Sequence, residues 1–225
     1  MDSCPAERGV GDHGKSAGIL SALLARLPLG VSPRPEVRGF SSCFGTASTG
    51  GPSPKAIVTR ATRMNKDLLK EINLALQALD DFPAGFVYNA IQAAHDTRVE
   101  LHCDKGNDGP SVAFASGNFE GGDLVVSGET FKLKNCCVAF DGRLPHSVTP
   151  YTGERRSLVA FSSPWFSHLT SEDVDFLKEC GFPFPEDSDA NAQADSDTKR
   201  RRMSDPEGSV ISEKSFDARR PVSVP

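Results

Sequence analysis

The chain has 225 residues, a formal net charge of −5 from 25 basic and 30 acidic side chains, and a hydrophobic share of only 38%. This length suffices for one domain with a packed core, and the low hydrophobic share indicates that part of the chain lies outside that core. The acidic balance argues against a protein that coats nucleic acid through its overall field. No run approaches the roughly 18–20 apolar residues of a membrane helix, so no membrane partner is expected.

Composition divides the chain into three regions. Residues 1–53 are rich in Gly, Ser and Pro, which predicts a flexible N-terminal arm, with a short helical pattern over residues 19–29. Residues 54–184 carry most of the aromatic and β-branched side chains, which predicts one folded domain. Residues 185–225 combine acids, Ser, Pro and a basic run from Lys199 to Arg202, which predicts a disordered charged tail.

Two helices are predicted within the middle region. The first covers residues 65–79, begins at Asn65 as N-cap and carries one apolar stripe. The stripe consists of Leu68, Leu69, Ile72, Leu76 and Leu79. The second covers residues 171–180, with Ser171 as N-cap, acids in its first turn and Gly181 as the stop.

Short segments of strand character, separated by Gly- and Asp-rich turns, lie between the two helices. They cover residues 86–91, 99–104, 111–115, 123–126, 130–133, 137–140, 147–149 and 156–161. Many short strands at regular spacing predict a mainly β sandwich or barrel, supported by a helix before the strands and a short helix after them.

Two histidines and one aspartate form the strongest chemical signal. In a strand, residues i and i+2 point to the same face, so His102 and Asp104 present an imidazole and a carboxylate side by side at a strand end. His146 begins a later strand, which in an antiparallel jelly roll can return beside the first. Such a set occupies one face of an octahedron, as in the facial triad of non-haem Fe(II) oxygenases. We therefore predict that these three residues bind a metal ion.

An arginine after the second histidine suits the cosubstrate of such a centre. When 2-oxoglutarate chelates iron, its far carboxylate needs a cationic partner inside the barrel, and a guanidinium can bind both of its oxygens. Alternation places Arg155 and Ser157 on one face of the predicted strand and Arg156 on the other. We predict that Arg155 is the anchor, with Ser157 beside it, and Arg156 is the alternative.

Two asparagines and a pair of glycines have secondary roles. Asn89, on the early strand, is a candidate to hydrogen-bond the cosubstrate or a metal-bound oxygen. Asn107 either shapes the turn after Asp104 or is a plain turn residue. Gly121 and Gly122 are expected to permit a tight hairpin.

Residues 86–162 resemble the catalytic core of the 2-oxoglutarate and Fe(II)-dependent dioxygenase superfamily, and in particular its algal and protist domains. Four motifs carry the resemblance. They are HCDKGNDGPS at 102–111, GGDL at 121–124, FDGRLPH at 140–146 and GERRSL at 153–158.

The resemblance implies a double-stranded β-helix that holds Fe(II) through His102, Asp104 and His146 and the 2-oxoglutarate carboxylate through Arg155. Molecular oxygen is then the second cosubstrate, and succinate and CO₂ are the coproducts. Related halogenases have a small residue in place of the carboxylate ligand. Because Asp104 is present here, hydroxylation or oxidative demethylation is expected.

Three readings of the substrate and function stay open. A protein, peptide or small-molecule substrate is favoured, because the core has no large insertion for reading a duplex. A nucleic-acid base oxygenase, with Lys199 to Arg202 as a contact, is the second, and a metal-binding jelly-roll module without turnover is the third. The six cysteines lack zinc spacing, which predicts an intracellular protein with reduced thiols. It would be cytoplasmic, or nuclear if the basic run is an address.

Overall fold

The computed structural model describes residues 13–31, 37–49, 55–104, 106–164 and 168–184. The chain divides into a unit Met1–Phe184 and a unit Pro185–Pro225, and all the described residues belong to the first. The predicted tail over residues 185–225, its basic run and the first 12 residues of the predicted arm lie outside the described part. Within that part, no helix is both long and apolar enough to cross a membrane.

The largest sheet has six strands, and every paired neighbour in it is antiparallel. Its order is β2 (Ala56–Val58), β1 (Val37–Ser48), β3 (Ala90–Val99), β11 (Arg156–Phe161), β4 (Ser111–Ser116) and β8 (Cys137–Phe140). β4 and β11 are central in this sheet. β11 pairs along its full length with both neighbours, and β4 pairs along its full length with β11 and from Ser111 to Phe114 with β8. They therefore form the middle of the large sheet, and residues of both strands line the cavity described below.

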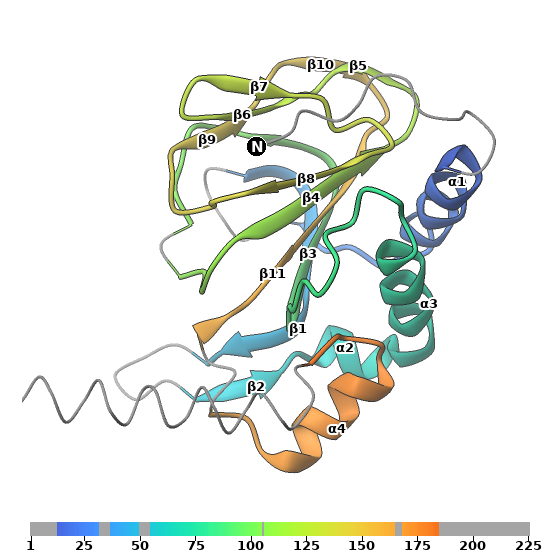
Figure 1. Ribbon diagram of the computed structural model, residues 1–225, viewed down its shortest axis with the longest axis vertical. Coiled ribbons are helices and arrows are strands. Elements are labelled where there is room, and N and C mark those ends of the chain that lie inside the picture. Colours follow the sequence, from blue (N-terminus) through green and yellow to red (C-terminus); the bar gives the residue numbers. More distant parts are fainter. Residues whose placement is uncertain (1–12, 32–36, 50–54, 105, 165–167, 185–225) are drawn as a thin grey trace, which may run out of the picture. The chain divides into compact units, whose positions relative to one another are not determined.

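A smaller sheet faces the large one. It consists of β7 (Glu129–Phe131), β6 (Leu124–Val126) and β9 (His146–Val148), and a separate pair joins β5 (Phe119–Gly121) to β10 (Tyr151–Gly153). Figure 1 shows these short strands grouped beside β4 and β8. Buried side chains from both sheets form one core cluster, including Leu124 and Val126 from one and Ala113 and Phe140 from the other. The predicted mainly β fold is confirmed, with two packed antiparallel sheets as in a jelly roll.

Helices cover the other face of the large sheet. They are α1 (His13–Leu24), α2 (Arg60–Met64), α3 (Lys66–Gln77) and α4 (Ser171–Glu179). In Figure 1, α1 and α3 run side by side, and they contact each other. Leu69 and Ile72 of α3 lie in a buried cluster with Phe44, Ile91 and Leu158 of the sheet. The apolar stripe predicted for residues 65–79 thus stabilises the helix by packing rather than by propensity alone.

The prediction of a flexible arm over residues 1–53 is wrong for the part of it that the structure describes. Helix α1 contributes to the core, and β1 pairs with β3 from Val37 to Gly45. Gly45 has φ +97, and a Cβ there would lie 2.1 Å from the carbonyl oxygen of Asn89. Gly45 therefore permits the close approach of β1 and β3 and does not indicate a flexible segment.

Some details of the predicted elements differ. The predicted strands over residues 86–91 and 99–104 are replaced by the single strand β3, because its pairing with both β1 and β11 outweighs the weak strand propensity of its centre. The N-cap of α4 is Thr170 rather than Ser171, since the Thr170 hydroxyl accepts a hydrogen bond from the backbone N–H of Asp173.

Candidate metal centre

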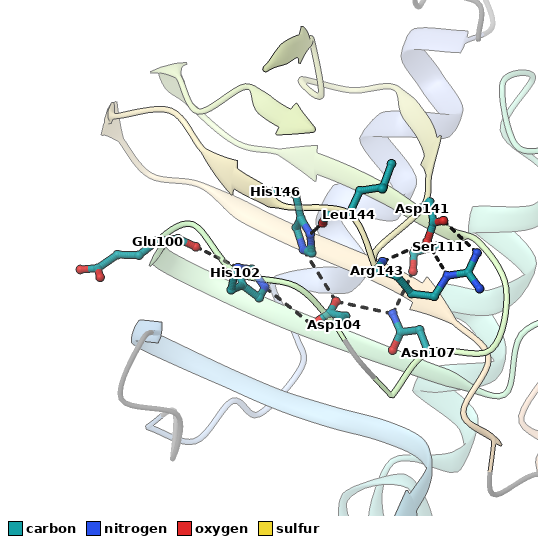
Figure 2. Close-up of polar contacts among 9 residues, drawn as sticks. All are labelled: Glu100, His102, Asp104, Asn107, Ser111, Asp141, Arg143, Leu144 and His146. Carbon is teal, nitrogen blue, oxygen red and sulfur yellow. Dashed lines mark hydrogen bonds and ion pairs between the residues drawn. The ribbon is translucent and has the colours of Figure 1, made fainter. Parts of the chain in front are cut away.

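The structure brings His102, Asp104 and His146 together. Each offers one ligand atom, and these atoms all lie within 4.8 Å of one another. The Nε2 atom of His102 lies 3.6 Å from Oδ1 of Asp104, and Nε2 of His146 lies 3.7 Å from Oδ2 of the same carboxylate. Figure 2 shows both imidazoles directed toward this carboxylate. The carboxylate therefore lies next to both rings, whose centroids are 4.2 Å apart.

Backbone pairing, not strand alternation, produces this convergence. His102 and His146 form an isolated antiparallel bridge, in which each backbone N–H donates to the other's carbonyl at 3.0 and 2.9 Å. The backbone N–H of Asp104 donates to the carbonyl oxygen of Gly142 at 2.8 Å. The expectation that His102 and Asp104 share one face of a regular strand is wrong, since β3 ends at Val99 and the residues that follow are irregular.

Both imidazoles are oriented by a carbonyl two residues earlier in the chain. Nδ1 of His102 is 2.8 Å from the carbonyl oxygen of Glu100, and Nδ1 of His146 is 2.9 Å from that of Leu144. Because a carbonyl can only accept, each Nδ1 carries a proton in these bonds, and in the neutral ring Nε2 then has the lone pair that a metal binds. The rings are thus prepared as ligands before any ion arrives.

A small polar network supports the carboxylate. The Asn107 amide nitrogen donates to the Ser111 hydroxyl at 3.1 Å and lies 3.5 Å from Oδ2 of Asp104 (Figure 2). A Cβ on Gly142 would lie 3.1 Å from that amide nitrogen, so the glycine leaves room for it. Of the two readings of Asn107, the structure favours a residue that shapes the surroundings of Asp104.

The three residues line a cavity of about 140 Å³ between the two sheets. Its walls are mainly apolar, and they also include Arg155 and Ser157. The Arg155 side chain belongs to a residue only 3% exposed, and its Nε has no hydrogen-bond partner. No carboxylate in the described part of the chain forms an ion pair with it, and burial lowers its pKa. A buried cation without a counter-charge is costly, so the cavity suits an anionic ligand.

The neighbouring arginine lies elsewhere. Arg156 forms an ion pair with Glu154 at 2.5 Å and does not line the cavity. Ser157, two residues after Arg155, does line it, as the predicted alternation requires. Of the two candidate anchors, only Arg155 is therefore placed beside the three ligand residues.

Asn89 is not brought into the cavity. Its amide donates to the carbonyl oxygen of Ser163 at 3.2 Å and accepts from the Ser163 N–H at 2.9 Å. Both ends of the side chain are bonded to the backbone of Ser163, and Asn89 does not line the cavity, so the structure gives no support to Asn89 as a cosubstrate contact. Gln92 and Ser41 line the cavity instead. The register of β3 explains Gln92, because it lies opposite Val159 and shares its face.

The residues fit the groups that the resemblance implies. Two imidazoles and one carboxylate are the donor set of facial-triad iron sites. The unpartnered Arg155 Nε, with a hydroxyl two residues away, suits a carboxylate. His102, Asp104 and His146 would hold the metal, and Arg155 would hold the far end of the cosubstrate.

Comparisons with known proteins identify only distant structural similarity. No family model and no curated protein match the chain. An oxidoreductase of the 2OG-Fe(II) oxygenase family from Burkholderia pseudomallei is 19% identical, with 72% of this chain and 95% of that chain covered and a TM-score of 0.41. NgTET1, solved with 5mC DNA, is 14% identical, with 76% and 77% covered and a TM-score of 0.44. A prolyl hydroxylase from Trichoplax adhaerens, solved with a hypoxia inducible factor peptide, is 11% identical, with 66% and 79% covered and a TM-score of 0.38.

Proposed function

We propose that the protein is a 2-oxoglutarate- and Fe(II)-dependent dioxygenase that hydroxylates or oxidatively demethylates its substrate and releases succinate and CO₂. One observation carries the proposal. The ligand atoms of His102, Asp104 and His146 converge in a cavity that also holds the buried and unpaired Arg155. Neither feature alone is specific, but together they match a metal centre with a separate binding point for a carboxylate.

The residues of the chain have distinct tasks in this function. Bound iron and 2-oxoglutarate would supply the oxidative chemistry, including activation of O₂. The carbonyls of Glu100 and Leu144 keep both Nε2 atoms available as ligands. Arg155 binds the far carboxylate of the cosubstrate, and the apolar walls exclude water, which strengthens that ion pair.

The substrate is expected to be a protein, a peptide or a small molecule. A base oxygenase that uses Lys199 to Arg202 remains the second reading, and this run lies outside the described residues. A metal-binding module without turnover is the third. All three retain the metal site, so turnover of the cosubstrate is what separates the third from the others.

The experiment measures succinate formed from 2-oxoglutarate by NMR, with Fe(II) and air, in the wild type and three variants. We expect slow uncoupled release in the wild type and none in His102→Ala. Arg155→Gln should raise the KM for 2-oxoglutarate by about 10- to 100-fold, the cost of losing a charge-assisted hydrogen-bonded pair. Arg156→Gln is the matched control and should behave as the wild type, since Arg156 lies outside the cavity.

Two outcomes would contradict this assignment. A wild type that binds metal but forms no succinate, alone or with pooled peptides, nucleotides and metabolites, would be the binding module. A raised KM in Arg156→Gln with a normal KM in Arg155→Gln would show that Arg156, and not Arg155, binds the cosubstrate carboxylate.

A further inference from the structure

Two aromatic rings lie against Arg155 outside the cavity. The Cζ atom of Arg155 is 5.5 Å from the ring centroid of Phe119 and 5.6 Å from that of Tyr151. The two ring centroids are 6.2 Å apart, with 71° between the planes. Both distances are within the range of cation–π attraction, so the guanidinium lies in the corner between two nearly perpendicular rings.

A glycine lies against the stem of the same arginine. A Cβ on Gly122 would be 3.0 Å from Nε and 3.1 Å from Cδ of Arg155, and 3.2 Å from the Phe119 ring. Any larger residue would therefore have to displace the arginine or the ring. Gly121 and Gly122 do not form the predicted hairpin, because Gly121 pairs with Tyr151 on a strand that lies far along the chain.

The pairing of β5 with β10 brings the two rings together. Each aromatic residue lies opposite a glycine, Tyr151 opposite Gly121 and Phe119 opposite Gly153. Both glycines have positive φ, and a Cβ on Gly153 would lie 2.1 Å from the carbonyl oxygen of Asn118. This two-stranded sheet can form only with glycine at these points, and its consequence is that both rings face Arg155.

We propose that Phe119, Tyr151 and Gly122 form an arginine clamp, which positions the Arg155 guanidinium to bind the distal carboxylate of a dicarboxylic 2-oxo acid. This inference rests on the proposed function. Phe119 and Tyr151 do not line the cavity, so they act through Arg155 and are positioning residues rather than catalytic ones. The clamp selects for the second carboxylate of the ligand and leaves the metal-binding end unaffected.

Two physical effects support this role. An arginine side chain loses rotational freedom when it binds a ligand, and rings that already hold it reduce that entropic cost. The rings also stabilise the buried cation electrostatically without neutralising it. A carboxylate of the protein would neutralise its charge. The guanidinium therefore stays charged and unpaired until a ligand carboxylate arrives.

The test measures binding rather than turnover. The full-length protein is loaded with Mn(II), and the Kd values of 2-oxoglutarate and of 2-oxopentanoate are determined by calorimetry. The second acid has the same chelating end but lacks the distal carboxylate. Tyr151→Leu and Phe119→Leu, made separately, should each weaken 2-oxoglutarate by about 3- to 30-fold and leave 2-oxopentanoate within 2-fold of the wild type. Tyr151→Phe keeps the ring and should bind both acids as the wild type does.

The outcomes separate the two proposals. If the wild type does not bind 2-oxoglutarate, the proposed function fails and the clamp with it. If the wild type binds 2-oxoglutarate but the Leu variants lose affinity for both acids equally, the rings serve only the fold and the clamp is refuted. Equal affinities in the Leu variants and the wild type, or a loss in Tyr151→Phe as large as in Tyr151→Leu, would also refute it. Melting temperatures of the Mn(II)-loaded variants identify any that do not fold, and either Leu variant alone suffices for the test.

Discussion

Replacing the carboxylate of the three-ligand group should uncouple the stability of the protein from divalent metal. Asp104→Asn keeps the shape of the side chain but removes the negative charge, which is the only anionic ligand of the group. The backbone bond from Asp104 to Gly142 does not involve the side chain and is retained. The contact with Asn107 is long, at 3.5 Å, so the metal-free variant should fold nearly as well as the wild type.

The size of the effect follows from linkage. A ligand that binds only the folded state stabilises it by about 2.7 kcal/mol when its concentration is 100 times its Kd. For a folded unit of this size, 1 kcal/mol shifts the melting temperature by roughly 2–4 °C, so the wild type should gain about 5–11 °C. Loss of a ligand should weaken binding at least as much as loss of a supporting residue, about 10- to 100-fold. A 10-fold loss reduces the gain to about 1.4 kcal/mol, or about 3–6 °C, and larger losses reduce it further.

The assay is thermal melting during a titration with Mn(II). Mn(II) binds ligands similar to those of Fe(II) and does not oxidise the protein. Asp108→Asn is the matched control, because Asp108 is exposed, close in sequence and absent from the cavity lining. It should show the full wild-type shift. Identical shifts in Asp104→Asn and the wild type would mean that the metal binds elsewhere. A wild type that does not respond to millimolar Mn(II) would refute the metal centre itself.

Two further predictions concern groups away from the metal. Tyr88 is fully buried, and its hydroxyl donates a hydrogen bond to Oδ1 of Asn73 at 2.8 Å. Tyr88→Phe removes this donor from Asn73 and should lower the free energy of unfolding by about 1–3 kcal/mol. Urea titrations measure this loss, and the m value should stay unchanged. A change below about 0.5 kcal/mol would contradict the assigned bond. Hydrogen bonds from Arg143 lower the pKa of Asp141 to about 2. Because this pKa is below its unfolded value, the pair stabilises the fold above about pH 4 and the contribution is lost as the pH falls toward 2. Arg143→Gln should raise the Asp141 pKa in carboxyl NMR titrations, and an unchanged value would exclude Arg143 as the cause.

The sequence predicts elements well where one periodic pattern decides the structure. The leucine stripe from Leu69 to Leu76 predicts α3 because a helix with this face must bury it. The sequence predicts β1 poorly, because small residues such as Gly39, Ser41 and Gly45 are typical of flexible segments. That strand forms because β3 supplies its hydrogen-bonding partners, and the need for those partners is not visible in local sequence.

The identities of the three residues that converge in the candidate metal centre could be predicted, but the reason they meet could not. Spacing places His102 near Asp104 in any extended chain. The actual positions depend on the bridge between His102 and His146 and on the carbonyl of Gly142, which are long-range backbone bonds. Asn89 illustrates the same limit from the other side. Its type suits a cosubstrate contact, yet its amide is used by the backbone of Ser163.

Arg155 shows what alternation can and cannot reveal. The alternation of side chains along β11 correctly separates Arg155, which lines the cavity, from Arg156, which does not. It does so although Arg155 is one residue before the start of the strand, because the alternation continues over that residue. This alternation says nothing of the rings of Phe119 and Tyr151, two residues that lie 32 positions apart in the chain and come from different strands. Their meeting requires glycines at Gly121 and Gly153, which by sequence alone indicate only turns. The position of an arginine anchor can therefore be predicted from the sequence of its own strand. The aromatic rings that hold the arginine in place depend on tertiary strand pairing, so they are identified only in the folded structure.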